Sequence, residues 1–356
     1  MPSRAKKTVN LALQGGGAHG AFTWGVLDRL LEEEALEFEG ISATSAGAMN
    51  AAAMKSGLLE GGREGARQAL DDFWRSISRI NPGVPNPLLE WVRAFHPSTE
   101  NLADAIEAGA SWGVGDSLTR MFSPYDLNPF NINPLRRLLT EQLHFDQVCN
   151  AEPPHLFICA TNVRTGKGRV FRGEEISSDA ILASTCLPSL FQAVEIEDPT
   201  TGRMESYWDG GFTGNPALWP LFYETAARDV VIVHINPLER DEAPRSAREI
   251  ISRTNEISFN SALLGELRAV SFVRRLISEG KIAEGAMKDV LVHSIIDDAT
   301  MNKLGAATKM VADWQLMEHL KQAGREAGER FLREDWANLG ERPSVDLHAL
   351  YSAYPR

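Results

Sequence analysis

Short apolar runs alternate with helical apolar patterns in the N-terminal part of the chain. Val9–Leu13 and Phe38–Ala43 are apolar runs of strand length. Between them, Ala21–Glu33 repeats apolar residues at the spacing of one helix face. A second helix is predicted over Ala46–Ser56, which is rich in alanine and precedes Gly57. Strands and helices in this alternation predict a parallel sheet with helices on its faces.

The same reading extends the α/β pattern as far as Asp229–Ile235, a continuous β-branched run typical of a strand buried in a parallel sheet. Further helices are predicted over Arg63–Ile80, Pro134–Leu143 and Asp179–Thr185, and further strands over Leu156–Asn162, Arg169–Arg172, Val194–Ile196 and Glu205–Trp208. Prolines and aromatic residues break the pattern between residues 81 and 133. That stretch either packs over the core or forms a lid or acyl-chain-binding surface.

The composition changes after Asn236. A charged linker, Glu239–Glu242, leads into helical segments over Ala247–Ser278 and Leu304–Leu332, and the strand-like run Asp289–Ile296 separates the two. The first of these helices carries an apolar stripe formed by Leu263, Leu267, Val270, Val273 and Ile277. Such a stripe predicts that the C-terminal segment packs onto the preceding body.

Charge and cysteine content narrow the class of protein. Lys and Arg number 36 against 48 Asp and Glu, a formal net charge of −12. This charge argues against a sequence-independent nucleic-acid binder and against simple electrostatic docking to an anionic bilayer. The chain has three cysteines, Cys149, Cys159 and Cys186, and no two of them lie close together in the sequence. We therefore expect free thiols rather than a disulfide or a metal site. The apolar run near the N-terminus is too short for a signal peptide, and no window is long enough to span a membrane. We therefore expect a cytoplasmic protein.

Two glycine-bearing turns stand where a predicted strand meets a predicted helix. The first is Gly15–Gly20, and the second contains Ser45 in the sequence ATSAG. A strand-to-helix turn exposes backbone N–H groups at the positive end of a helix, where they can hold an anion. The small residues around Ser45 also fit a nucleophile elbow. Together, one turn supplies a nucleophile and the other the donors for the oxyanion that it creates.

The glycine loop has a competing interpretation. Gly15, Gly17 and Gly20 satisfy G-x-G-x-x-G, and Glu37 or Glu39 follows at about 20 residues, as in a dinucleotide-binding unit. A dehydrogenase, however, does not need a serine flanked by small residues in the second turn. An aspartate followed by two glycines, at 209–211, favours a hydrolase.

In order along the chain, QGGGAHG at 14–20, ATSAG at 43–47 and DGG at 209–211 resemble the signatures of the patatin-like acyl hydrolases. Supporting similarity runs from about Val9 to Leu221. The resemblance implies a three-layer α/β/α patatin-like fold with a mainly parallel central sheet. It divides the chain into a catalytic domain, residues 1–240, and a mainly helical C-terminal extension, residues 241–356, packed on the core.

The resemblance also implies a Ser–Asp dyad that works without a catalytic histidine, a metal or another cofactor. Ser45 is then the nucleophile, Asp209 the base, and the backbone N–H groups of Gly15, Gly16 and Gly17 the oxyanion hole. Supporting positions are His19, Gly20, Gly47, Gly210 and Gly211. A carboxylate with an ordinary pKa near 4 is a poor base for a hydroxyl, so desolvation beside Trp208 and Phe212 is expected to raise the pKa of Asp209. The implied substrate is a fatty-acyl ester lipid; the sequence does not choose among phospholipid, lysophospholipid, neutral lipid and storage polyester.

Two departures from the family pattern and two further alternatives stay open. Ala43 replaces the first glycine of G-x-S-x-G, and His19 stands where arginine or lysine is frequent, either as a pH-dependent charge or as an ordinary loop residue. A Ser–Asp–His triad using His234 or His293 is disfavoured because Ser45 follows only the second strand, and His234 is better read as structural. A nucleotide-binding protein and an inactive scaffold remain the other classes, and contact with a lipid surface and the oligomeric state are left open.

Overall fold

The computed structural model describes residues 5–80, 123–143, 148–149, 152–199, 201–240, 242–283 and 285–351. Within these residues, eight strands form one sheet in the order β5-β6-β3-β2-β1-β7-β8, with β4 paired to β3. The strands are β1 (Lys7–Leu13), β2 (Leu36–Ala43), β3 (His155–Asn162), β4 (Gly168–Arg172), β5 (Val194–Asp198), β6 (Arg203–Asp209), β7 (Asp229–Val233) and β8 (Leu291–Ile295). The proline- and aromatic-rich stretch lies mostly outside the described residues.

Helices cover both faces of this sheet. The helices of the described residues are α1 (Gly20–Leu31), α2 (Ala46–Ile80), α6 (Pro124–Leu127), α7 (Pro134–Gln142), α9 (Ser178–Ser184), α10 (Trp219–Tyr223), α11 (Ala247–Ser278), α12 (Asp298–Met301), α13 (Ala306–Met310), α14 (Trp314–Glu334) and α15 (Leu347–Tyr351). In the described part of the chain, none of them is both long and apolar enough to cross a bilayer.

The centre of the sheet is parallel. β1 pairs in parallel with both β2 and β7, β2 pairs with β3, and β7 pairs with β8. Only the outer strands β4, β5 and β6 run antiparallel to their neighbours. Because parallel strands end at the same edge, the turns after β1, β2 and β7 meet there. The predicted mainly parallel sheet is confirmed.

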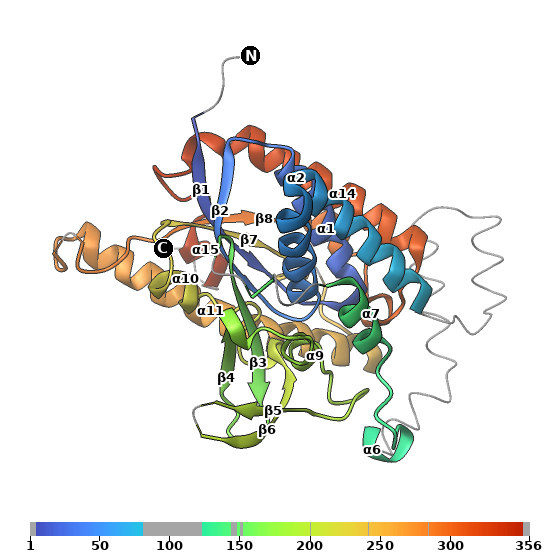
Figure 1. Ribbon diagram of the computed structural model, residues 1–356. Helices are drawn as coiled ribbons and strands as arrows, with labels where there is room; N and C mark the ends of the chain where they lie inside the picture. The colour runs from blue at the N-terminus through green and yellow to red at the C-terminus, as the bar shows by residue number, and fades with distance from the viewer. Residues whose placement is uncertain are drawn as a thin grey trace.

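Side chains of the central strands point alternately to the two faces of the sheet and contribute to two hydrophobic cores. Val9, Leu11 and Leu13 of β1 face a core that includes α1, α2 and α14. Ala12 of the same strand belongs to a second core, on the side of α10 and α11. Successive side chains of a strand point to opposite faces, so a strand buried on both sides is apolar throughout. The result is the three-layer α/β/α arrangement expected from the sequence, with α1, α2 and α14 on one face (Figure 1).

The predicted end of the second helix at Gly57 is wrong. α2 continues through Gly57 and is interrupted only at Gly61 and Gly62, whose backbone is not helical, before resuming to Ile80. A Cβ on Gly57 would overlap the backbone carbonyl of Gly65, so this glycine is needed for close packing within the kinked helix rather than for termination. The sequence pattern singled out Gly57 correctly but assigned it to helix termination instead of close packing.

The C-terminal segment joins the body more closely than its helical pattern suggested. The strand-like run near residue 290 forms β8, which extends the parallel sheet beside β7. The predicted helix over 304–332 is two helices, because α13 ends at Met310 and Asp313 caps a new one by accepting the N–H of Leu316. As predicted, Leu263, Leu267 and Val270 of α11 are buried against the sheet. The division at residue 240 stays a prediction, since the sheet itself continues across it.

α1 is buried on nearly all sides, not on one face as its pattern predicted. The cause is α14, which crosses it at close range: a Cβ on Gly25 would overlap the carbonyl oxygen of Lys321, and one on Gly324 would overlap that of Phe22. Trp24 stacks on Trp74 at a ring-centroid distance of 6.3 Å beside this crossing. Glycines on both helices therefore set how closely α14 approaches.

Gly25→Ala should push α1 and α14 apart and lower the free energy of unfolding by about 1–3 kcal/mol, the usual result of overpacking. The matched control is Gly265→Ala on the exposed side of α11, where a Cβ meets nothing within 4 Å. That change should raise the free energy of unfolding by about 0.5–1 kcal/mol, because alanine favours a helix over glycine. Urea denaturation of both variants measures the difference; equal effects would contradict a close helix crossing.

Candidate active site

Ser45 occupies a strained turn between β2 and α2. Its backbone has φ 53°, in the left-handed region that few non-glycine residues adopt. Its N–H donates to Ser184 Oγ at 2.9 Å, and the N–H of Gly47 donates to the carbonyl of Thr44 at 2.9 Å. The side chain is only half-buried. This is the geometry of a nucleophile elbow, in which the turn lifts the hydroxyl above the sheet.

Ala43 does not strain this elbow. It is the last residue of β2, where it pairs with Leu13 and Ile158 of the neighbouring strands and lies fully buried in the core. The left-handed conformation falls two residues later, on Ser45. The methyl group that replaces the family's first glycine is therefore a packing side chain at a regular strand position.

Asp209 ends β6 and faces Ser45. Its carboxylate accepts a hydrogen bond from the N–H of Gly211 at 2.7 Å and another from the Ser45 side chain. Burial raises the pKa of Asp209 to about 6, although both hydrogen bonds act to lower it. The carboxylate thus has the raised basicity that a dyad needs.

Short contacts fix the distance between the two turns. A Cβ on Gly210 would overlap the carbonyl of Cys159 and approach Thr44 Cγ2 to 3.0 Å. Gly211 is similarly confined, since a Cβ there would lie 3.3 Å from the ring of Phe259. In addition, Thr44 Oγ1 donates to the carbonyl of Gly214 at 2.7 Å. The two glycines after Asp209 therefore allow its strand end to pack directly on the serine turn.

The glycine loop after β1 lies against the serine. A Cβ built on Gly15 would stand 2.6 Å from Ser45 Cβ. However, the N–H of Gly15 already donates to Asn215 Oδ1 at 2.6 Å, so it is not available to an oxyanion. Within the described residues, no acceptor contacts the N–H of Gly16 or of Gly17. The predicted role of the Gly15 N–H as an oxyanion donor therefore conflicts with its bond to Asn215, and the roles of Gly16 and Gly17 stay predictions.

The other predicted glycines serve helix starts. Gly20 opens α1, and a Cβ there would lie 2.6 Å from Ala46 Cβ. Gly47 lies in the first turn of α2, where a Cβ would overlap the carbonyl of Leu13. Both keep α1 and α2 close to the end of β1.

Amide side chains that were not predicted from the sequence hold the glycine loop. The carbonyl of Gly15 accepts hydrogen bonds from Asn236 Nδ2 at 2.7 Å and from Asn215 Nδ2 at 3.5 Å. Gln14 Oε1 in turn accepts the N–H groups of Ile235 and Asn236 at 2.9 and 3.0 Å. Two signals were present: Asn215 stands in the family-like stretch NPALWPL, and Asn236 directly follows the last residues of the strong strand run.

The three histidines considered for the site, His19, His234 and His293, have partners elsewhere. His19 is buried, contacts Thr308 Oγ1 at 2.8 Å, and has a pKa well below its ordinary value because of burial first and then the charges of Lys309 and Arg240. Burial and these two charges all favour the neutral imidazole, so they support the interpretation of His19 as an ordinary loop residue over that of a pH-dependent charge. His234 lies 3.1 Å from Ser294 Oγ, and burial lowers its pKa to about 4. His293 contacts Asp229 and Ser344.

None of these three histidines hydrogen-bonds to Ser45 or Asp209 within the described residues.

The two glutamates that could bind a ribose in a dinucleotide site, Glu37 and Glu39, already have hydrogen-bond partners. Glu37 pairs with Lys6 at 2.5 Å, and Glu39 accepts the N–H groups of Ala226 and Ala227 at 2.6 Å each. Both glutamates lie before the carboxyl end of β2, where a dinucleotide-binding unit needs its acid.

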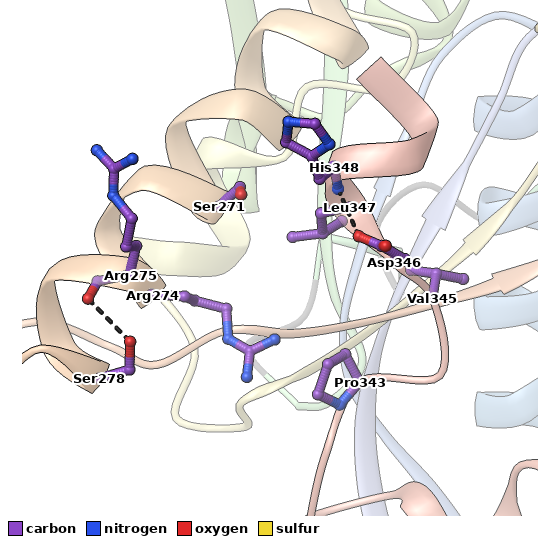
Figure 2. A pocket seen from close by; sticks show the side chains of 9 residues that line it. All are labelled: Ser271, Arg274, Arg275, Ser278, Pro343, Val345, Asp346, Leu347 and His348. Carbon is purple, nitrogen blue, oxygen red and sulfur yellow. Dashed lines mark hydrogen bonds between the residues drawn. The ribbon is translucent and has the colours of Figure 1, made fainter. Parts of the chain in front are cut away.

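A groove elsewhere on the molecule is not part of this site. Figure 2 shows it between α11 and the segment that leads into α15. Arg274, one of its residues, is paired with Asp289 at 2.9 Å, and Ser278 donates to the carbonyl of Arg275. No residue of the three motifs lines it.

Comparison with known proteins agrees with the geometry. A family model described as patatin-like phospholipase matches residues 11–222, a range that contains Ser45, Asp209 and the glycine loop. No curated protein matches the sequence. Among solved structures, the chain is similar to VipD from Legionella pneumophila, with a TM-score of 0.40 and 14% sequence identity over 93% of this chain and 67% of that chain. A likeness this low says nothing about activity.

The raised pKa of Asp209 has a consequence for stability. A folded-state pKa of about 6, above the ordinary 3.8, means that the folded protein holds this proton more tightly than the unfolded chain does. The stability contributed by protonated Asp209 is complete below about pH 4 and is lost as pH rises through about 6, a difference of up to about 3 kcal/mol. Asp209→Asn removes the ionisation and keeps the shape.

We therefore expect Asp209→Asn to be more stable than the wild type at about pH 8, by about 1–3 kcal/mol, and not at about pH 4. Urea denaturation of both proteins across this range measures the difference. A difference in free energy of unfolding that does not change with pH would contradict a buried, ionising Asp209.

Proposed function

This chain belongs to the patatin-like phospholipase family, and from that membership and the site geometry we propose that it hydrolyses fatty-acyl ester lipids with Ser45 as nucleophile and Asp209 as base. One observation carries the proposal. The hydroxyl of a serine held at φ 53° donates to a buried carboxylate whose pKa is about 6, directly beside a glycine loop. These residues supply a candidate nucleophile, a candidate base and a candidate oxyanion-binding loop, the three parts of an acyl-transfer site.

The reaction proceeds in two balanced halves. Ser45 Oγ attacks the acyl carbonyl carbon while its proton passes to Asp209. Collapse of the tetrahedral intermediate breaks the ester bond, and protonated Asp209 gives the proton to the departing alcohol. Water then attacks the acyl–Ser45 ester, again losing its proton to Asp209, and the fatty acid leaves as Ser45 Oγ regains a proton. No cofactor enters either half.

The oxyanion of each intermediate is proposed to bind the N–H groups of Gly16 and Gly17. These amides lack an acceptor within the described residues, and the loop that carries them touches the serine turn. One preorganised donor of this kind typically contributes about 3 kcal/mol to transition-state stabilisation. The positive end of α1 lies just beyond, because Gly20 begins that helix.

Two alternative functions have less support. Binding of a dinucleotide lacks its acidic partner, because Glu37 and Glu39 are engaged near the amino end of β2. A Ser–Asp–His triad lacks its histidine, because His234 is directed to Ser294 and His293 to Asp229 and Ser344. A cytoplasmic location, contact with a lipid surface and a catalytic unit over residues 1–240 remain part of the proposal.

Replacing either dyad member should abolish hydrolysis. We expect Ser45→Ala and Asp209→Asn to lower kcat/KM for p-nitrophenyl esters by at least about 10³-fold, with EDTA present throughout. His234→Gln is the matched control and should stay within about threefold of the wild type, because this histidine supports no step of the reaction. Full activity in a pure preparation of Ser45→Ala would contradict the proposal that Ser45 is the nucleophile.

The pH dependence tests the base. Because Asp209 must be ionised to accept a proton, kcat/KM should rise about tenfold per pH unit below about 6 and level off above about 7. The sign follows from burial, which raises the pKa of Asp209 to about 6. Initial rates from about pH 4.5 to 8.5 measure the profile. A plateau that already begins near pH 4.5 would show that a group with an ordinary carboxyl pKa, or none, controls the rate.

A further inference from the structure

The peptide group between Gly15 and Gly16 is held from one side. Its carbonyl oxygen accepts Asn236 Nδ2 at 2.7 Å and Asn215 Nδ2 at 3.5 Å. A trans peptide is planar, with its C=O and N–H pointing in opposite directions. Fixing the oxygen of Gly15 therefore also fixes the direction of the N–H of Gly16.

A partly buried lysine, Lys309, determines which way Asn236 presents its side-chain amide. Lys309 Nζ donates to Asn236 Oδ1 at 2.8 Å. An ammonium group has only donors, so a flipped Asn236 would turn its own NH₂ against it and present an oxygen to the carbonyl of Gly15. The Lys309 contact thus selects the orientation in which Asn236 donates to the loop.

Lys309 is also packed on the glycine loop through its backbone. It lies in α13, and its carbonyl oxygen fills the space that a Cβ on Gly17 would need. The nearby carboxylate of Glu256 is already paired with Arg240 at 2.5 Å and with Arg253 at 3.1 Å. The ammonium group is therefore not required to neutralise Glu256, and its direct hydrogen bond is to Asn236.

We propose that Asn236 and Lys309 are positioning residues that orient the N–H of Gly16 toward the oxyanion. Both lie beyond residues 11–222, the range of the family match, and Lys309 belongs to the C-terminal segment. The inference rests on the proposed function and extends it: a helix of the extension tunes the oxyanion hole without touching the substrate.

Asn236→Asp is the sharpest test, because it separates positioning from packing. The carboxylate keeps the shape of the side chain and its contact with Lys309 but loses the Nδ2–H donor, and it repels the carbonyl of Gly15. We expect kcat to fall roughly 10- to 100-fold with KM within about twofold, because the lost stabilisation is felt only in the transition state. Thermal unfolding checks that the fold is retained.

Lys309→Met is the second variant. It keeps the aliphatic stem and leaves Glu256 paired, so it should lower kcat by a smaller factor, about 3- to 10-fold, by releasing Asn236 to flip. The matched control is Lys288→Met. This half-buried lysine also donates to backbone carbonyls, those of Leu221 and Thr225, but at the amino edge of the sheet. It should leave kcat unchanged even if it lowers the melting temperature.

The readout that a purely structural role would not move is affinity for an oxyanion mimic. An alkyl trifluoromethyl ketone adds the serine hydroxyl and forms a hemiketal oxyanion, so its Ki should rise in Asn236→Asp by about the factor that kcat/KM falls. Lys288→Met should leave Ki unchanged. Kinetics with p-nitrophenyl octanoate supply the matching rates.

The outcomes separate this inference from the function that it rests on. Wild-type kcat and Ki in both Asn236→Asp and Lys309→Met, while Ser45→Ala is inactive, would overturn the positioning role and leave the dyad intact. If Asn236→Asp does not fold, an unchanged Ki in Lys309→Met overturns it alone. A wild-type protein that neither hydrolyses these esters nor reacts with a fluorophosphonate at Ser45 would remove the proposed function and the inference together.

Discussion

The shared carboxyl edge of β2, β1 and β7 is the constraint on which the rest of the site depends. Strand spacing in a parallel sheet is fixed by hydrogen bonding, so the turns after these strands are forced into contact. The glycine loop follows β1, Ser45 follows β2, and Asn236 follows β7. Only small residues fit where the loop and the elbow touch, which is why a Cβ on Gly15 would reach Ser45 Cβ. Backbone packing at this edge therefore sets the geometry of the proposed site.

Burial of the Asp209 carboxylate favours its proposed role as a base but lowers the stability of the folded protein when the group is ionised. Burial gives Asp209 the basicity that the proposed proton transfer requires, and the same burial makes its ionised form unfavourable in the folded state. The protein retains the charge because Gly211 and Ser45 donate to it. A site of this kind is held together by its surroundings, which here include the two asparagines and the strand ends that support them.

Much of the fold and of the site could be predicted from the sequence because local signals agreed with one another. The apolar runs at 9–13 and 38–43 are strands in the structure, the β-branched run at 229–235 is a strand as far as Val233, and α11 has the predicted bounds Ala247–Ser278. Ser45 and Asp209 were identified by motif, and the structure brings them together. The lowered pKa of His19 could not be predicted, since it follows from burial and from the charge of Lys309, 290 positions later in the chain. The engagement of Gly15 by Asn215 is likewise a contact between distant segments, which no local pattern carries.

The position of β8 has a consequence for biosynthesis. This strand, at residues 291–295, pairs with β7, and α14, which follows it, covers α1 near the start of the chain. During translation, the first strands and the nucleophile elbow leave the ribosome long before the elements that close their sheet and cover their core. Contacts of such long sequence separation form late and slowly. Until then, the edge of β7 and the apolar surface of α1 stay uncovered, and the glycine loop lacks the contact of Gly17 with Lys309.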